Sequence, residues 1–261
     1  MAQAPRRPVP SFRYEEALWA ADLRHVAGVD EVGRGPVAGP VFAAAVILDP
    51  KQKRTRWMRD LRDSKMLDAA ERERLAAVVR REALAWSISW STVAEINAWG
   101  ISKANYTAMV RAVSGLDIHP EHLLIDGPIT VDHPLPQTAI IDGDAYCTSI
   151  AAASVIAKVA RDALMSDLGF FYPNYGFEIH KGYATKDHLE RIERYGVCSQ
   201  HRNSWLAVQR RHAVFEAGEA LDDPEALSEI LDAVLNDMDR ESSSVEAHNG
   251  VMNSMGTAHL V

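Results

Sequence analysis

The feature that most constrains this chain is a pair of carboxylates placed inside a strongly apolar segment. The stretch GVDEVGRGPVAGPVFAAAV, residues 28–46, carries Asp30 and Glu31 next to small apolar residues that are typical of a buried strand. A carboxylate at the edge of a hydrophobic core is costly unless a partner or a cation neutralises it. The chain must therefore fold so that something holds both acids.

Hydrophobic patterning predicts a mixed α/β fold. Five segments are typical of strands: HVAGVDEV, PVFAAAVILD, WSISWSTV, HLLIDG and TAIIDGD. Three segments show helical spacing: DAAERERLAAVVRREALA, residues 103–113 and TSIAAASVIAKVARDALMSDL. Three strands come first, with a glycine turn between the first two, and strands then alternate with helices. This order favours an antiparallel first hairpin and parallel later strands.

Charge is distributed unevenly along the 261 residues. Residues 216–261 carry 11 acidic residues and a single arginine, whereas residues 1–215 carry 27 basic and 25 acidic residues. The body is thus mildly basic and compatible with a polyanionic partner, although the whole chain has a net charge of −8. We expect a flexible N-terminal arm over 1–20, one main domain over 21–215 and an acidic extension over 216–261, partly helical and then disordered.

The sequence indicates neither a membrane protein nor an oxidising compartment. Its longest nearly unbroken apolar run, residues 37–48, is too short to span a bilayer, and the Pro/Arg-rich N-terminus lacks the apolar core of a signal peptide. Cys147 and Cys198 fit neither a zinc spacing nor a disulfide framework. Two unpaired thiols in a reducing, cytoplasmic environment are therefore expected.

Four acidic residues lie at or just beyond apolar runs: Asp30, Glu31, Asp126 and Asp144. In an open α/β sheet the carboxyl ends of adjacent strands converge on one crevice, where crowded carboxylates raise each other's pKa unless a cation joins them. Ligand sets made only of oxygen suit Mg²⁺ or Mn²⁺ rather than zinc. Two such ions, about 4 Å apart, can clamp the attacking and leaving oxygens of a phosphodiester. Each acid taken alone is explained more simply as a turn cap, but three segments with the same ending favour a metal site.

Two points of this interpretation stay open. Neighbouring strand residues point to opposite faces, so the strand must end, bulge or twist at Glu31 for both acids to reach one site. Asp142 is an alternative to Asp144 that spacing alone does not separate.

The segment GRGPVAGP fits a dinucleotide-binding loop poorly, because its third glycine is one position late and it leads into a strand. Gly33 and Gly35 lack side chains, so their backbone amides could approach a sugar-phosphate chain, with Arg34 reaching a phosphate or stabilising the turn. A tight hairpin that needs positive φ is an equally good interpretation.

The motifs GVDEVGRGPVAGPV, LRDSKML, LLIDG, GDAYCTSIAAASVIAKVARD and YGFEIHKGYATKDH together resemble bacterial ribonuclease HII, the type 2 ribonuclease H. The resemblance covers most of residues 26–206. It implies the ribonuclease H-like fold, an α/β fold with a mixed five-stranded sheet flanked by helices, followed here by the C-terminal helical extension. It also implies endonucleolytic cleavage of RNA in RNA–DNA hybrids and 5′ of single ribonucleotides embedded in duplex DNA. Two metal ions would support in-line attack by water, leaving 3′-hydroxyl and 5′-phosphate ends.

The same resemblance assigns roles to individual residues. The family's metal-binding set falls on four carboxylates and so selects Asp144 over Asp142: Asp30, Glu31, Asp126 and Asp144. Its glycine-arginine-glycine loop, which reads the ribose 2′-hydroxyl, falls on Gly33, Arg34 and Gly35. Its junction-sensing tyrosine falls on Tyr183 rather than Tyr175, although Tyr183 taken alone would be interpreted as a surface or packing residue.

Further positions are expected to contact the substrate backbone: Ser64, Lys65, Lys158, Arg161 and Lys181. Lys158 is equally well explained as structural. Met66 stands where relatives usually have a lysine, which removes a positive charge from this path. His180 and His201 are weaker candidates for proton transfer or phosphate binding.

The implied partners are RNA–DNA hybrids and ribonucleotide-containing duplex DNA, with Mg²⁺ or Mn²⁺ as cofactor and no membrane. We expect a monomer. The acidic extension could dock on the domain, mimic a polyanion or bind a protein partner. A hybrid-binding protein without catalysis is the competing hypothesis, and it is disfavoured because all four carboxylates are present.

Overall fold

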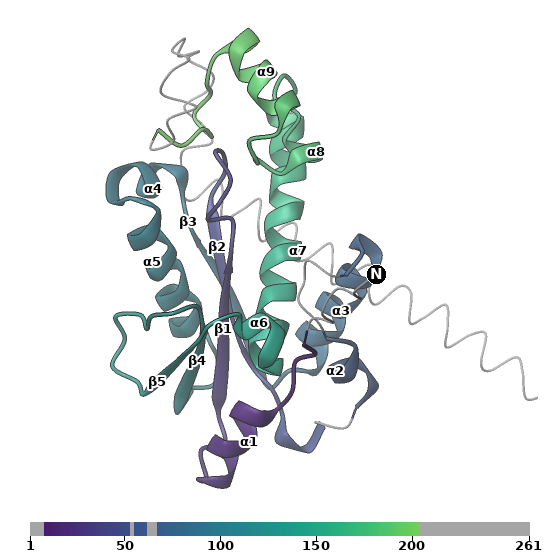
Figure 1. Cartoon of the computed structure of the whole chain (residues 1–261), viewed down its shortest axis with the longest axis vertical. Helices are drawn as coiled ribbons and strands as arrows, with labels where there is room; N and C mark the ends of the chain where they lie inside the picture. The colour runs from purple at the N-terminus through teal and green to yellow at the C-terminus, as the bar shows by residue number, and fades with distance from the viewer. Residues whose placement is uncertain (1–7, 53–54, 62–66, 204–261) are drawn as a thin grey trace, which may run out of the picture.

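A mixed five-stranded sheet organises residues 8–52, 55–61 and 67–203, the part of the chain that this computed structural model describes (Figure 1). The strands, in their order across the sheet, are β3 (Ala85–Ser91), β2 (Val41–Ile47), β1 (Val26–Val32), β4 (His122–Asp126) and β5 (Gln137–Ile140). β1 and β3 both run antiparallel to β2, whereas β4 is parallel to β1 and β5 is parallel to β4. The predicted mixed sheet, with its antiparallel hairpin and later parallel strands, is confirmed.

Helices cover both faces of the sheet, which explains why β2 is apolar at every position. α5 (Ile101–Ser114) packs against β2 and β3, while α7 (Thr148–Phe171) packs against β1 and β2 from the other side (Figure 1). Every residue of β2 is buried. A strand buried on both faces has no reason to alternate polar and apolar residues.

The first turns of α7 approach β1 at backbone distance. A Cβ at Gly28 would lie 2.2 Å from the carbonyl carbon of Ser149, so only glycine fits there. The residues 150–153 that follow are all buried. This close packing brings Ser154, one turn further along α7, within hydrogen-bonding range of the Asp30 carboxylate.

The remaining elements complete the two helical layers. They are α1 (Arg13–Ala20), the short 3-10 helix η1 (Pro50–Gln52), α2 (Arg56–Asp60), α3 (Ala69–Glu82), α4 (Val93–Trp99), α6 (Gly143–Tyr146), α8 (Phe177–His180) and α9 (Lys186–Tyr195). Three of the helices begin at side-chain caps, Asp68 before α3, Thr92 before α4 and Thr185 before α9. These residues satisfy amide groups that a helix N-terminus otherwise leaves unpaired.

Residues 13–20, expected to belong to a flexible arm, form α1 and are packed on the domain. The fully buried Glu15 accepts hydrogen bonds from the Ser149 amide at 2.7 Å and the Cys147 thiol at 3.2 Å. Since the α7 N-terminus presents unsatisfied amides, an acceptor supplied by α1 is stabilising there. Burial raises the pKa of Glu15 above its usual value. Residues 1–7 and the acidic extension 216–261 lie outside the described residues.

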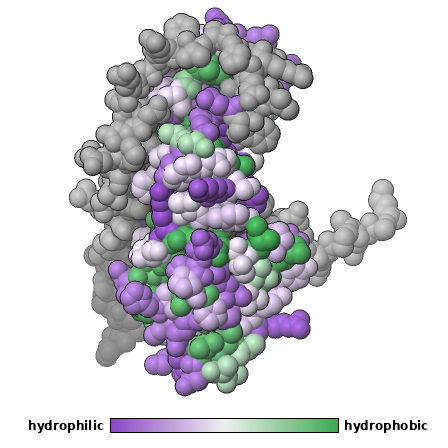
Figure 2. Space-filling model, turned by 90° about the vertical axis from the view of Figure 1, so that its left-hand side faces the viewer, coloured by the Kyte–Doolittle hydropathy of each residue, from purple (hydrophilic) through white to green (hydrophobic). Residues whose placement is uncertain are grey.

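Among the described helices, none is long and apolar enough to cross a membrane. On the face that carries α4 and α5, Figure 2 shows hydrophilic residues interspersed with small apolar patches. Cys147 and Cys198 are both buried free thiols, as predicted.

Candidate active site

Three carboxylates converge where β1 and β4 present their carboxyl ends. Asp30, Glu31 and Asp126 each offer an oxygen that lies within 4.8 Å of the other two. The parallel pairing of β1 with β4 runs as far as Val29↔Ile125, so the next residue of each strand is one of these aspartates. The topology therefore places Asp30 beside Asp126, as expected for adjacent parallel strands.

Glu31 joins this cluster although β1 neither ends nor bulges there. The pairing of β1 with β2 continues without a break through Glu31↔Ala43 to Val32↔Phe42, so an end or a bulge at Glu31 is the wrong expectation. The ladder with β4 stops at Val29, which leaves the other edge of β1 open from Asp30 onward. The Glu31 carboxylate nevertheless lies within the cluster.

Asp144 lies beside the three-carboxylate cluster rather than within it. It is carried by α6, directly after β5, and is 8% exposed. Its charge contributes to the raised pKa of Asp30, so the two are neighbours, but the set of oxygens within 4.8 Å does not include it. Asp142, with φ of 53°, is exposed. The geometry therefore favours Asp144 over Asp142.

Negative charge is crowded in this cluster. Asp30 is 4% exposed, accepts a hydrogen bond from the Glu31 amide at 2.7 Å and another from Ser154. Burial, and then the charges of Glu31 and Asp126, raise the pKa of Asp30 well above its usual range. A divalent cation would supply the missing charge. Carboxylate oxygens at this spacing fit Mg²⁺ or Mn²⁺.

The two glycines of the Gly33–Gly35 loop differ in what the fold requires of them. Gly33 has φ of +95°, and a Cβ there would lie 2.3 Å from Nε of Arg161. At Gly35, by contrast, φ is not in the left-handed region and a Cβ would meet only the Tyr183 ring, at an ordinary 3.7 Å. The hairpin interpretation thus explains Gly33. Nothing within the described structure demands a glycine at Gly35.

Arg202 lies beneath this loop, a role that no sequence pattern predicts. Its guanidinium is fully buried and donates to five backbone carbonyls. The acceptors are Gly33 at 2.7 Å, Pro36 and Gly39 at 2.8 Å, Arg34 at 3.1 Å and Pro40 at 3.2 Å. In SQHRNSW, an arginine among polar residues is typical of a solvated surface, so only the structure identifies it.

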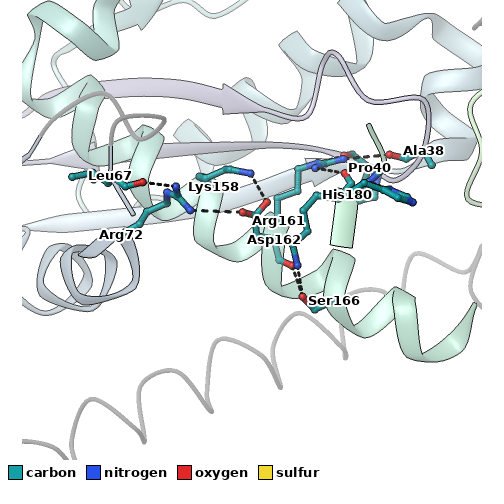
Figure 3. A network of polar contacts seen from close by, with 11 residues as sticks. Ala38, Pro40, Leu67, Arg72, Lys158, Arg161, Asp162, Ser166 and His180 are labelled. Carbon is teal, nitrogen blue, oxygen red and sulfur yellow. Dashed lines mark hydrogen bonds and ion pairs between the residues drawn. The ribbon is translucent and has the colours of Figure 1, made fainter. Parts of the chain in front are cut away.

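Arg161 is a second buried guanidinium, and its predicted contact with the substrate backbone is wrong. It is fully buried in α7 and donates to the carbonyls of Pro40 at 3.0 Å, Lys181 at 3.0 Å and Ala38 at 3.2 Å. Figure 3 shows it directed at Ala38 and Pro40. Since its donors are occupied inside the protein, its role is to join the loop to the segment at 181.

Tyr183 lies against the Gly33–Gly35 loop. The amides of Val37 and Ala38 donate to the Gly182 carbonyl at 2.9 and 3.3 Å, and the Tyr183 ring, 43% exposed, stands beside Gly35. Tyr175 is buried instead and stacks on Phe177. The structure thus brings Tyr183, and not Tyr175, to the loop.

Basic side chains gather along α7 next to this region (Figure 3). Lys158 and Arg72 both contact Asp162, at 2.5 and 3.9 Å, and Lys181 donates to Ser166. The three cations are only partly exposed, and burial lowers the pKa of Lys158 and of Lys181. Asp162 is thus held between Lys158 and Arg72, and its charge also acts on Lys181. Ser64, Lys65 and Met66 lie outside the described residues.

With this geometry in place, the comparison with known proteins is decisive. Residues 27–208 match the family model described as Ribonuclease HII. The chain belongs to the ribonuclease HII family. It is 50% identical over 198 residues to the ribonuclease HII of Geobacillus thermodenitrificans, covering 76% of this chain and 74% of that protein. It is also 50% identical over 191 residues to that of Laribacter hongkongensis, covering 72% and 93%.

A solved structure supports the fold assignment. The ribonuclease H2 from Pyrococcus horikoshii OT3 superposes with a TM-score of 0.61 at 27% identity, covering 71% of this chain and 95% of that one. As a member of the ribonuclease HII family, the chain is a metal-dependent ribonuclease H that hydrolyses RNA in RNA–DNA hybrids.

Three buried histidines lie behind the Tyr183 segment of this ribonuclease HII. The Cys198 amide donates to Nδ1 of His201 at 2.9 Å, so the His201 proton is on Nε2, which donates to Nε2 of His188 at 3.1 Å. His188 then donates from Nδ1 to the Tyr183 carbonyl at 2.8 Å. Burial lowers the pKa of His188 to about 4 and that of His201 to about 3, so both are neutral.

His180 stacks on His188 with ring centroids 4.0 Å apart and is fixed in the same way. It accepts from the Gly182 amide at 3.2 Å and donates to the Tyr175 carbonyl at 2.7 Å. The idea that His180 or His201 transfers protons or binds phosphate therefore finds no support, since their ring nitrogens are occupied inside the domain. We call the series of hydrogen bonds from the Cys198 amide through His201 and His188 to the Tyr183 carbonyl the histidine relay.

Proposed function

We propose that this chain cuts duplex DNA on the 5′ side of single embedded ribonucleotides as well as RNA in longer hybrids. The products carry 3′-hydroxyl and 5′-phosphate ends. The observation that carries the proposal is a juxtaposition: the carboxylate cluster, the Gly33–Gly35 loop and the Tyr183 ring adjoin one another. Gly33 follows Glu31 by two residues, Arg34 lies 3.8 Å from the Glu31 carboxylate, and Gly35 faces Tyr183.

The four carboxylates would hold the divalent ions, Mg²⁺ or Mn²⁺, with two in the active complex: Asp30, Glu31, Asp126 and Asp144. Such ions, when bound, activate water and stabilise the leaving oxygen. The chain itself orients the ligands. The Glu31 amide and Ser154 hold Asp30, and the Gly143 amide donates to Asp126 at 2.6 Å.

The Gly33–Gly35 loop is the candidate reader of the ribose. Among the hydrogen bonds of the described residues, none is donated by the amides of Arg34 or Gly35. A 2′-hydroxyl both donates and accepts, so it can bind such amides, and a deoxyribose cannot. The fold does not require a glycine at Gly35, and the absence of a Cβ there leaves room for the sugar.

Tyr183 is the candidate sensor of the RNA-to-DNA step. Its exposed ring could stack on the sugar of the next nucleotide, where a deoxyribose fits and a 2′-hydroxyl is excluded. Lys158, Lys181 and Arg72 would attract the phosphates, together with Ser64 and Lys65. Binding that rests on such contacts weakens as the salt concentration rises.

We further propose that the enzyme acts in the cytoplasm as a monomer on DNA that contains ribonucleotides, and that residues 216–261 serve a protein partner. These points rest on the composition of the chain and on family membership. Residues 1–20, 21–215 and 216–261 remain our proposed division of the chain, amended by the packing of α1 on the domain.

Cleavage of an end-labelled DNA duplex with one ribonucleotide tests the proposal. With Mg²⁺ or Mn²⁺, the wild-type chain is expected to cut 5′ of the ribonucleotide, and Asp126→Asn to abolish the cut. Asp142→Asn is the matched control, because Asp142 is a nearby carboxylate that is exposed and outside the cluster. Cleavage of long hybrids without any cut at the single ribonucleotide would contradict the proposal.

A further inference from the structure

Arg161 and Arg202 are two buried cations held almost entirely by backbone. Every hydrogen bond that the described residues provide to either guanidinium comes from a main-chain carbonyl. Both donate to the same oxygen, that of Pro40, at 3.0 and 3.2 Å. Burial lowers the pKa of Arg161 to about 10 and that of Arg202 to about 9, so both stay charged at neutral pH. Burying two like charges side by side is costly, and it persists only if the arrangement is heavily hydrogen-bonded.

The arrangement determines where the loop amides point. A trans peptide unit is planar, and its C=O and N–H point in opposite directions. The described residues contain no cis peptide bond. Because the Gly33 carbonyl points at Arg202, the Arg34 amide must point away from it, and the Arg34 carbonyl fixes the Gly35 amide in the same way. These are the two amides that no hydrogen bond within the described residues uses.

Arg161 adds the second half of the arrangement. Its Nη1 donates to the Lys181 carbonyl while Nε and Nη2 donate to Pro40 and Ala38, so one side chain joins the loop to the segment that carries Tyr183. Hydrogen bonds from the amides of Val37 and Ala38 to the Gly182 carbonyl reinforce this connection. The loop and the tyrosine thus form one unit, although they are about 150 residues apart in the sequence.

We propose that Arg202, supported by Arg161, is a positioning residue for ribose recognition: it aims the Arg34 and Gly35 amides at the 2′-hydroxyl of the substrate. This inference rests on the proposed function of the loop. Arg202 touches no substrate atom itself. A lysine cannot replace it, because one ammonium with three donors cannot reach five carbonyls that surround a planar guanidinium.

The test compares the binding of two fluorescein-labelled duplexes of the same sequence, one with a single ribonucleotide and one all-DNA. Fluorescence anisotropy in Ca²⁺ gives both dissociation constants, and a gel confirms that the duplexes stay intact. For Arg202→Lys we expect the ratio of the two dissociation constants, which measures the preference for the ribonucleotide, to fall roughly tenfold. A change of this size corresponds to the loss of one buried hydrogen-bonding interaction. The affinity for the all-DNA duplex should stay unchanged. Arg80→Lys is the matched control: Arg80 is also buried, on α3 over Trp86, and should keep the full preference.

The outcomes are separable. If Arg202→Lys keeps the wild-type preference, or if both affinities fall by one common factor, Arg202 is merely structural and the inference is overturned. If the wild-type chain itself binds both duplexes equally, the proposed function fails before any variant is considered. Should Arg202→Lys not fold, as judged by circular dichroism, Arg161→Lys takes its place with the same expected loss of preference.

Discussion

The carboxylate cluster and the Gly33–Gly35 loop are separated by one residue of β1, yet their electrostatic arrangements are opposite. Asp30, Glu31 and Asp126 crowd negative charge into a buried site, and the pKa of Asp30 rises as a result. The loop and the segment that follows it, as far as Pro40, supply carbonyls to two buried positive charges, Arg161 and Arg202. In the proposed function, the first region is completed only when a cation binds. The second is complete before the substrate arrives.

Asp30→Asn gives the largest expected effect and moves activity and stability in opposite directions. Losing a metal ligand should lower kcat at least roughly 100-fold, since metal-borne charge stabilisation is lost. Without metal, the variant should melt a few degrees higher, because a buried charge among like charges is removed. Cleavage assays and calorimetry in EDTA measure the two effects.

The sign of the stability effect follows from the raised pKa of Asp30. A carboxyl that binds its proton more tightly in the folded state destabilises that state above the pKa of the unfolded chain. The advantage of Asp30→Asn over wild type should therefore shrink as the pH falls from 7 toward 4. A metal-free variant less stable than wild type at pH 7 would contradict the repulsion described here.

Gly33→Ala and Gly35→Ala sharpen the comparison within the loop. Alanine at Gly33 must adopt φ near +95° with its Cβ against Arg161, so we expect a loss of about 2 kcal/mol in the free energy of unfolding. Alanine at Gly35 should leave stability unchanged, because its Cβ makes only an ordinary contact with Tyr183, but it should lower kcat/KM roughly tenfold, because the Cβ would meet the substrate. Urea denaturation and steady-state kinetics separate the two. A stable, fully active Gly35→Ala would show that no sugar approaches this residue.

The histidine relay predicts a loss of stability in mild acid. Folded His188 and His201, with pKa values of about 4 and 3, stay neutral where the unfolded chain takes up protons, below about pH 6.5. Stability should be full above that pH and fall by about 2 kcal/mol or more by pH 5. Urea denaturation at pH 7.5 and 5 measures this drop. His188→Asn should reduce the drop, whereas substitution of the exposed His119 should leave it intact.

Tyr183 gives the smallest effect, confined to one substrate. Tyr183→Ala should lower the cleavage rate at single ribonucleotides roughly tenfold, as expected for the loss of one stacking contact. The rate on long hybrids should fall much less. Tyr183→Phe should stay active on both because the ring is retained. Cleavage rates on the two substrates, measured side by side, decide the point. Equal losses on both would remove the junction-sensing role.

The sequence predicts the features that repeat along the chain or lie within one segment. Strand directions follow from the pattern, and Asp30 and Asp126 are found because each ends an apolar run in the sequence. Arg202 could not be found in this way, because its five acceptors lie more than 160 residues away. Arg161 was assigned the wrong role for a related reason: whether an arginine on an alanine-rich helix faces solvent or the core depends on what packs over it. Glu15 was missed similarly, since only the folded domain brings it to the α7 N-terminus.

The bonds of Arg202 also impose an order on folding. Gly33 and Arg202 are 169 residues apart, so this contact closes one of the longest loops in the domain. A ribosome that has released the chain as far as α9 has delivered all four carboxylates and the five strands of the described sheet, but not the arginine that holds the loop. The acidic pair and the loop leave the ribosome early and together. The loop, however, is completed only when nearly the whole domain has emerged. A truncated product that ends before Arg202 would thus contain the proposed metal ligands while lacking the residue proposed to aim the loop amides at a ribonucleotide.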